Sequence, residues 1–154
     1  MNKEQKFFKL LKYSNELEKN KKFLFKEDPE VFKTLSKFLI IIEENLHYAE
    51  KDKYSELIQD FLDDKINAED FSIFFMTMYE GINQNLRQMI KDFKEKSFEL
   101  SDFLIESKRY KIGNSLARVY GYCDSFNPDS NSCIADEEEL RNCAQILLDE
   151  LQQT

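Results

Sequence analysis

The chain has 154 residues, with 30 Asp and Glu against 22 Lys and Arg and a formal net charge of −8 at pH 7. Its three Gly and two Pro are too few to connect the strands of an all-β sandwich or to form a glycine-rich phosphate loop. We therefore expect an all-α protein, an antiparallel helical bundle of about five to seven helices in a single domain over 1–154.

The first fifty residues predict two amphipathic helices. Apolar residues three or four apart indicate a helix over 3–24. Asp28 can cap a second helix and Pro29 can occupy its first position, where a missing N–H costs nothing. The apolar stripe of this second helix continues to about residue 47. We interpret the Phe residues of the stretch 3–26 as a buried helix face with lysines on its solvated side, and not as a nucleic-acid surface.

The middle of the chain predicts two further helices. The polar stretch 50–53 contains no helix breaker, and we favour a break there over one continuous helix to Leu62. Asn67 can cap the next helix, with acidic residues in the first turn, where the helix dipole favours them. The expected terminator of that helix is Gly81. Its buried face is expected at Phe71, Phe74, Phe75 and Met78.

The last third of the chain predicts three helical segments. One pattern indicates a helix over 83–104, divided at Ser101. A short helix over 112–120 is expected to end in a polar loop over 121–132. Asp136 then caps the final helix, with an acid three residues later that reaches back to complete a capping box.

Side chains that could carry chemistry are few. The single histidine, His47, stands among carboxylates, and we interpret it as a surface residue, because one imidazole supplies neither a zinc site nor a catalytic triad. Loops counted from Asp124 or Asp129 lack the Gly and Glu that a calcium loop requires. We expect no enzyme activity, no catalytic residue, no metal site and no cofactor.

The cysteines bear on the compartment. Cys123, Cys133 and Cys143 stand ten residues apart, a spacing that matches no zinc signature. Any one disulfide would leave a thiol unpaired, which suggests a reducing compartment. The start of the chain shows no secretory signal, and the longest apolar run, 38–42, is far shorter than the ~20 residues that span a bilayer. The expected location is the cytoplasm, or an organellar stroma or matrix.

Acidic charge increases along the chain. Residues 1–50 hold 10 basic and 9 acidic side chains, residues 51–100 hold 7 and 11, and residues 101–154 hold 5 and 10. Such a surface repels nucleic acid and anionic membranes, so we expect neither as a partner, and it attracts a basic protein. Helix capping and solubility explain the same acids without any partner, and both explanations stay open at this point.

Three stretches resemble a known family. The sequence over 54–71, YSELIQDFLDDKINAEDF, resembles the opening of colicin D type bacteriocin immunity proteins: a Tyr-x-x-Leu-Ile-x-x-Phe-Leu helix, a tight turn ending in Ile, a small polar cap, Ala, acids and Phe. Residues 119–124 and 134–141 are similar to the family's short apolar helix with its acidic loop and to the start of its final helix. Tyr120 stands where the family has an Asp. The resemblance covers about 100 residues from Tyr54 onward.

The resemblance implies a four-helix-like immunity bundle over 51–154 that is not an enzyme, preceded by a helical-hairpin extension over 1–50 without a counterpart. Such a protein inhibits a toxin by covering the basic active site of its ribonuclease domain with carboxylates in place of phosphates. The partner-contacting carboxylates that we expect are Asp60, Asp63, Asp64, Glu69, Asp70, Asp124, Glu137 and Glu138. The alternative is a helical scaffold or adaptor without a toxin, which forms homo-oligomers or binds partners through its Phe-rich N-terminal helices.

Overall fold

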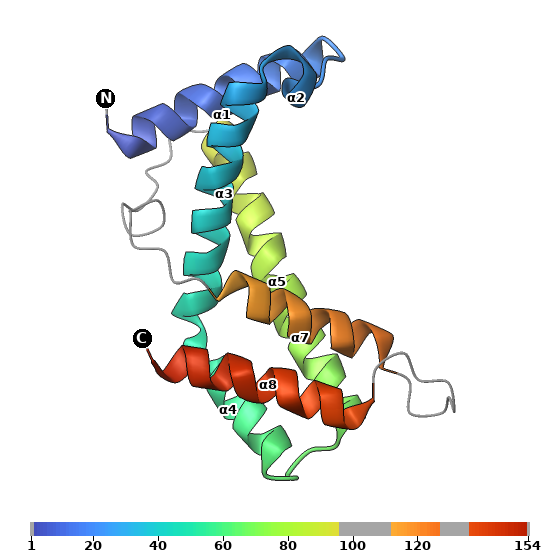
Figure 1. Ribbon diagram of the computed structural model, residues 1–154. Coiled ribbons are helices and arrows are strands. Elements are labelled where there is room, and N and C mark those ends of the chain that lie inside the picture. Colours follow the sequence, from blue (N-terminus) through green and yellow to red (C-terminus); the bar gives the residue numbers. More distant parts are fainter. Residues whose placement is uncertain (1, 96–111, 127–135, 154) are drawn as a thin grey trace. The chain divides into compact units, whose positions relative to one another are not determined.

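The computed structural model describes residues 2–95, 112–126 and 136–153, and every secondary-structure element in these ranges is a helix (Figure 1). The helices are α1 (Lys3–Lys19), α2 (Leu24–Glu27), α3 (Pro29–Ala49), α4 (Lys51–Leu62), α5 (Ala68–Glu95), α7 (Gly113–Ser125) and α8 (Glu137–Gln152). The expected all-α helical bundle is confirmed. The division at Ser101, the loop beyond residue 126 and Cys133 lie outside the described residues.

Short polar side chains begin the helices where the sequence predicts them. Asp28, Asn67 and Asp136 each accept a hydrogen bond, at 2.8 to 3.1 Å, from the backbone N–H three residues later. Each of these bonds satisfies a backbone donor that the first turn of a helix leaves without a partner. The break expected near residue 50 is also confirmed, because α3 ends at Ala49 and α4 begins at Lys51.

Helices α1 and α4 both end in a Schellman motif without a glycine. Lys21 and Asp64 take the left-handed conformation, with φ of 57° and 59°. In each turn the N–H of the following lysine donates to the carbonyl five residues earlier, at 2.9 Å after α1 and 2.8 Å after α4. The predicted single helix over 3–24 is therefore wrong in its last turn, because the chain turns at Lys21 and continues as α2.

Two glycines stand inside helices and not at their ends. Helix α5 continues through Gly81 and α7 continues through Gly121, so the expected terminator at Gly81 and the loop expected from Gly121 are both wrong. No glycine in the described ranges has a positive φ, and neither glycine therefore supplies a left-handed turn. The apolar pattern of α5 also keeps its phase across Gly81, since Phe75, Ile82 and Leu86 are all buried.

The chain forms two compact units. Unit 1 takes in Met1–Leu46 and Gln84–Arg109, and unit 2 takes in His47–Asn83 and Tyr110–Thr154. Helices α3 and α5 contribute residues to both. The core of unit 1 consists of Phe7, Leu11, Leu24, Leu35, Ile42 and Leu86. Because Leu86 belongs to α5, this core includes a side chain from well beyond the first fifty residues.

The N-terminal Phe residues of unit 1 divide between core and surface. Phe7 of α1 is buried and its ring lies 5.7 Å from that of Phe38 in α3; Figure 1 shows the two helices crossing. Phe23 and Phe25 are 61% and 50% exposed. The interpretation of all Phe residues in 3–26 as a buried face is therefore wrong for these two, because the turn at Lys21 removes them from the stripe of α1.

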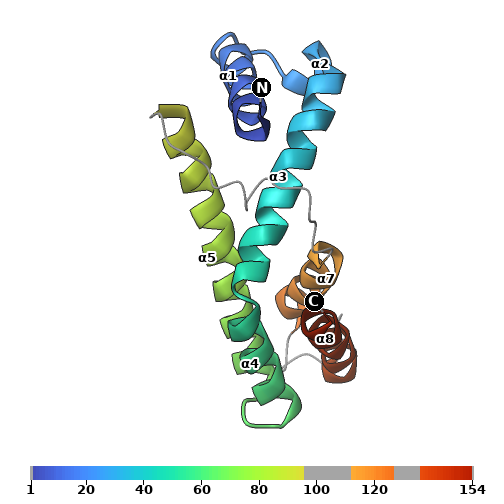
Figure 2. The same cartoon turned by 90° about the vertical axis from the view of Figure 1, so that its left-hand side faces the viewer.

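The core of unit 2 is largely aromatic. The rings of Phe61 and Phe71 stack with centroids 4.3 Å apart, and Phe75 lies 5.7 Å from Phe71 and 5.4 Å from Tyr54. Aromatic pairs of this kind add to the free energy of burying their area, and they join α4 to the first half of α5. Helix α8 packs against both α7 and α4 (Figure 2).

The helix through Gly81 leads to a stability prediction. An added methyl group at Gly81 meets no atom within 4 Å, and alanine favours a helix interior by about 1 kcal/mol over glycine. We expect Gly81→Ala to raise the free energy of unfolding by about 0.5–1 kcal/mol, measured by urea denaturation. Gly121→Ala, equally unobstructed inside α7, is the matched control and should behave alike. A loss of stability specific to Gly81→Ala would show that the helix does not continue there.

Candidate functional site

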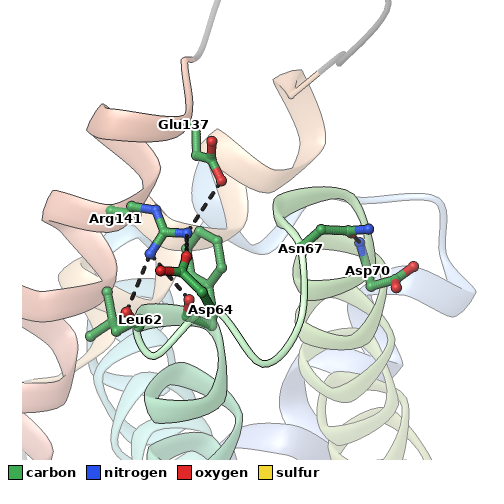
Figure 3. Close-up of polar contacts among 7 residues, drawn as sticks. Leu62, Asp64, Asn67, Asp70, Glu137 and Arg141 are labelled. Atoms are coloured by element: carbon green, nitrogen blue, oxygen red, sulfur yellow. Dashed lines mark hydrogen bonds and ion pairs between the residues drawn. The ribbon is translucent and has the colours of Figure 1, made fainter.

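Arg141 of α8 holds the end of α4 (Figure 3). Its guanidinium donates to the carbonyl oxygens of Phe61 and Leu62 at 3.1 and 3.4 Å, and it lies 4.5 Å from the centroid of the Phe61 ring. These carbonyls belong to the last turn of α4, where backbone acceptors lack their regular helical donors, and that of Phe61 also accepts from the Asp64 N–H at 3.1 Å. A side chain from one helix thus caps the C-terminus of another.

The same guanidinium pairs with two of the predicted contact carboxylates. Nη2 of Arg141 lies 2.5 Å from Oδ1 of Asp64 and 3.3 Å from Oε1 of Glu137. Both carboxylates are exposed, whereas Arg141 is partly buried. The structure therefore brings together two acids that the sequence places at separate helix boundaries. Because one positive charge serves two carboxylates, the cluster keeps a net negative charge.

The other predicted carboxylates around the α4–α5 turn make different contacts. Asp63 is exposed and accepts a hydrogen bond from the Gln59 amide at 3.0 Å. Asp60 is half-buried and pairs with Lys65 at 3.8 Å. Glu69 and Asp70 stand exposed in the first turn of α5, directly after the Asn67 cap.

The remaining two predicted acids lie on α7 and α8. Glu138 is exposed in the first turn of α8. Asp124 is exposed near the end of α7, and its charge contributes to the raised pKa of Tyr120 in the same helix. No described contact joins Asp124 to the Arg141 cluster. We define the acidic end of unit 2 as Asp63, Asp64, Glu69, Asp70, Glu137 and Glu138.

The acidic end carries a strong excess of negative charge. Residues 63–70 and 136–141 hold eight carboxylates, against the two cations Lys65 and Arg141. Lys65 pairs with Asp60 and Arg141 with Asp64 and Glu137, so both cations are already engaged. An exposed surface of this sign concentrates basic groups of a partner near it.

Two exposed apolar residues border the acidic end, and sequence reasoning missed both. Ile73 and Phe74 are 54% and 51% exposed, and the expectation that Phe74 belongs to the core is wrong. Phe71 and Phe75, one turn apart, fill the core instead. The four-residue spacing places Ile73 beside Glu69 and Phe74 beside Asp70 on the helix surface. This spacing from two acidic residues is the sequence signal that could have identified Ile73 and Phe74 as exposed.

Tyr120 connects α7 to α5. Its hydroxyl donates to Oε1 of Glu80 at 2.6 Å, and its ring lies 4.7 Å from that of Tyr79. The hydrogen bond to Glu80, followed by desolvation and the charges of Glu80 and Asp124, raises the pKa of Tyr120 to about 12. Tyr120 therefore serves as a neutral donor at neutral pH.

His47 is a buried residue, and its interpretation as a surface histidine is wrong. The side chain is 2% exposed, its Nδ1 lies 2.7 Å from the Tyr54 hydroxyl, and its Nε2 lies 3.0 Å from Oδ1 of Asn83. Its ring stacks on Tyr79 at 4.7 Å. Because an amide oxygen only accepts, Nε2 carries the proton and Nδ1 accepts from Tyr54. Burial lowers the pKa of His47, which keeps the ring neutral.

The described side chains contain no group of three or more His, Cys, Asp or Glu that could hold a metal ion. Burial raises the pKa of the Cys123 thiol to about 12 and that of Cys143 to about 11. Both thiols are therefore protonated at neutral pH, and neither is an activated nucleophile. The candidate binding surface is the acidic end, with its six exposed carboxylates.

Comparison of the chain with protein-family models, curated proteins and solved structures finds no match. No helix among the described residues is long and apolar enough to cross a bilayer.

The position of Arg141 predicts a dominant role in stability. We expect Arg141→Ala to lower the free energy of unfolding by about 2 kcal/mol, because two carbonyls lose a charged donor. Arg141→Lys should restore little of this, since one ammonium cannot contact both carbonyls and the ring. Asp64→Asn, at a side chain 78% exposed, should cost less than about 1 kcal/mol. Urea denaturation measures all three; equal losses for Arg141→Ala and Asp64→Asn would contradict the assignment.

The buried neutral histidine predicts a pH dependence of stability. The pKa of His47 is lowered from 6.5 in the folded chain, so the unfolded chain binds the extra proton first. The contribution of His47 is fully present above pH 6.5 and is lost as pH falls through the lowered folded-state pKa. We expect the free energy of unfolding to fall more steeply below pH 6.5 in the wild type than in His47→Gln.

His47 is the single histidine of the chain, so its imidazole proton resonance in the NMR spectrum reports the pKa directly. The wild-type minus variant difference removes the contribution of the carboxylates, which both proteins share. A difference that is independent of pH would show that His47 has the same pKa in the folded and unfolded chains, which would contradict the prediction.

Proposed function

We propose that this protein is a non-enzymatic binding protein whose acidic end takes up a basic protein partner, in the manner of the colicin D type immunity proteins that it resembles. The partner class is then the ribonuclease domain of a toxin, with its basic active site covered by carboxylates. The single observation that supports the proposal is the Arg141 cluster, which fixes exposed carboxylates from the α4–α5 turn and from α8 in one place.

The carboxylates of the acidic end suit rapid binding. They are exposed in the free protein, so the cost of removing them from water arises only when the partner supplies compensating charges. Complementary charge accelerates encounter, and the acceleration falls with ionic strength. The Asn67 and Asp136 caps hold the first turns of α5 and α8 in place before the partner arrives, which limits the ordering cost of association.

The apolar residues at the border supply a second element that such a surface requires. Ile73 and Phe74 stand one helical turn after Glu69 and Asp70 and are exposed. Tight interfaces combine charged groups with a few apolar anchors that slow dissociation. In this proposal the carboxylates govern the association rate, and Ile73 and Phe74 govern the dissociation rate.

A second candidate function, an oligomerising scaffold, is favoured by a different surface. Phe23, Phe25 and Phe32 are exposed on unit 1, a pattern that solvated helices of a monomer do not require. The gene neighbourhood separates the two candidates. A ribonuclease toxin encoded directly upstream favours the immunity function, whereas placement among housekeeping or organellar genes favours the scaffold.

Neutralising the acidic end should weaken partner binding without unfolding the protein. One variant combines Asp63→Asn, Glu69→Gln and Asp70→Asn; a second combines Glu137→Gln and Glu138→Gln. We expect each variant to bind the ribonuclease domain encoded by the upstream gene about tenfold or more slowly than the wild type at low salt. The difference should be smaller at high salt. Stopped-flow binding and inhibition of the ribonuclease measure the effect.

The matched control combines Glu16→Gln, Asp52→Asn and Glu56→Gln, which are exposed acids outside the acidic end. This control removes three negative charges, as many as the first variant and one more than the second, and it should leave the rate near that of the wild type. If the control and the acidic-end variants are equally slow, only total charge matters. If the acidic-end variants lose several kcal/mol of stability, their acids serve as caps and the proposal fails.

A further inference from the structure

A pocket of about 340 Å³ lies between α7 and α8 in unit 2. On each helix its lining residues are three or four positions apart, so they share one face of that helix. The two helices pack side by side and run in opposite directions (Figure 1), and the two faces therefore meet. We define the α7–α8 pocket by its lining residues, which are Asn114, Ser115, Arg118, Cys143, Ile146 and Glu150.

Glu150 brings a buried acceptor without a donor to this pocket. Its Oε2 atom is buried and has no hydrogen-bond partner among the described residues. An oxygen that is removed from water without a donor costs free energy, and buried polar atoms of native proteins are nearly always paired. The donor that suits a carboxylate best is a cationic N–H group, because hydrogen bonds between charged groups are the stronger ones.

Arg118 brings a cation that is equally unengaged. Within the described ranges its guanidinium forms neither an ion pair nor a hydrogen bond, with Glu150 or with any other side chain. Burial raises the pKa of the Cys143 thiol, and the charge of Arg118 is the largest effect that opposes this rise. The guanidinium therefore lies near the wall of the pocket, where it can bind a carboxylate with two parallel hydrogen bonds.

The rest of the wall is polar at one end and apolar at the other. Asn114 and Ser115 belong to the first turn of α7, and no side chain caps this N-terminus, where the helix dipole favours a negative group. Ile146 is 47% exposed. The Cys143 thiol donates to the Leu140 carbonyl at 3.3 Å. A few polar groups beside apolar wall, in a volume of this size, are typical of small-molecule sites.

We infer that the α7–α8 pocket binds a free α-amino acid with an apolar side chain. The ligand carboxylate binds Arg118 and the first turn of α7, the ligand ammonium donates to Oε2 of Glu150, and the apolar side chain contacts Ile146. A ligand that is only anionic leaves Glu150 without a donor and is repelled by it, and a ligand that is only cationic is repelled by Arg118. A zwitterion satisfies both charges.

This inference goes beyond the proposed function and uses none of its residues. The acidic end and the Arg141 cluster share no side chain with the α7–α8 pocket. Variants of the pocket therefore leave the carboxylates that bind the basic partner unchanged. Loss of amino-acid binding and loss of partner binding are separate results, and each idea can fail without the other.

Three related probes test the inference on the full chain. The first is L-leucine, the second is 3-methylbutylamine, which is leucine without its carboxylate, and the third is 4-methylpentanoate, which is leucine without its amine. Titration followed by NMR reports both the dissociation constant and the backbone amides that shift. We expect saturable binding of L-leucine with shifts in α7 and α8, and binding of each of the other two at least about tenfold weaker.

Two variants separate the two charges. Arg118→Gln and Glu150→Gln should each weaken binding of L-leucine by about tenfold or more. Arg118→Gln should not weaken binding of the amine, and Glu150→Gln should not weaken binding of the acid. The matched controls are Arg87→Gln and Asp149→Asn, which change exposed residues outside the pocket and should bind L-leucine like the wild type. Circular dichroism checks that every variant retains its helices.

Three outcomes would overturn the inference. One is the absence of shifts in α7 and α8 with L-leucine up to its solubility limit. A second is binding of the amine or of the acid as tight as that of L-leucine, which would make the pocket a site for a single charge. The third is strong coupling between Arg118→Gln and Glu150→Gln in the free energy of unfolding without ligand, which would show that the two side chains pair with each other in solution.

Discussion

The contact between the Arg141 guanidinium and the last carbonyls of α4 is the constraint on which the acidic end depends. Hydrogen bonds with a charged donor are about twice as strong as neutral ones, and here they reach carbonyls at a helix end that lack their regular helical donors. The flat guanidinium also covers the Phe61 ring, which in turn stacks on Phe71. One side chain thus links a helix end, an aromatic core and two exposed carboxylates.

This arrangement explains how so many like charges can share one end of the unit. Eight carboxylates along 63–70 and 136–141 repel one another, most strongly where water is excluded. Six of them stand at the N-termini of α5 and α8, where the helix dipole favours negative charge. Asp63 and Asp64 follow the C-terminus of α4, where the dipole does not favour them, and the Arg141 guanidinium pairs with Asp64 and with Glu137. On sequence grounds, helix capping and partner binding are competing explanations of the acidic residues. In this structure the two are compatible, because the caps hold the exposed carboxylates in place.

What the sequence predicts here is mostly local. Caps at Asp28, Asn67 and Asp136 depend on a side chain and an N–H three residues away, so they can be predicted from neighbours alone. The buried state of His47 depends on Tyr54 and Asn83, which come from two other helices. The role of Arg141 depends on carbonyls 79 and 80 positions earlier in the chain. Neither could be predicted from spacing along the chain, and the acidic end was predicted without the cation that organises it.

The two helical glycines also show that helix ends cannot be predicted from neighbouring residues alone. Gly81 and Gly121 suggested helix ends because glycine tolerates a left-handed turn, but a residue that permits a conformation does not impose it. The packed faces on both sides of Gly81 keep α5 continuous, and Lys21 and Asp64 take the left-handed positions instead.

Those two positions have a consequence for how stability and function are balanced. A residue with a side chain in the left-handed region is generally less stable there than glycine by about 1 kcal/mol, and Asp tolerates it better than Lys does. Lys21 belongs to the stretch 19–26, which holds four lysines, and Asp64 adds negative charge to the acidic end, where it pairs with Arg141. Both turns therefore keep an exposed charge at a position whose backbone conformation suits glycine, and each retains surface charge at some cost in backbone stability.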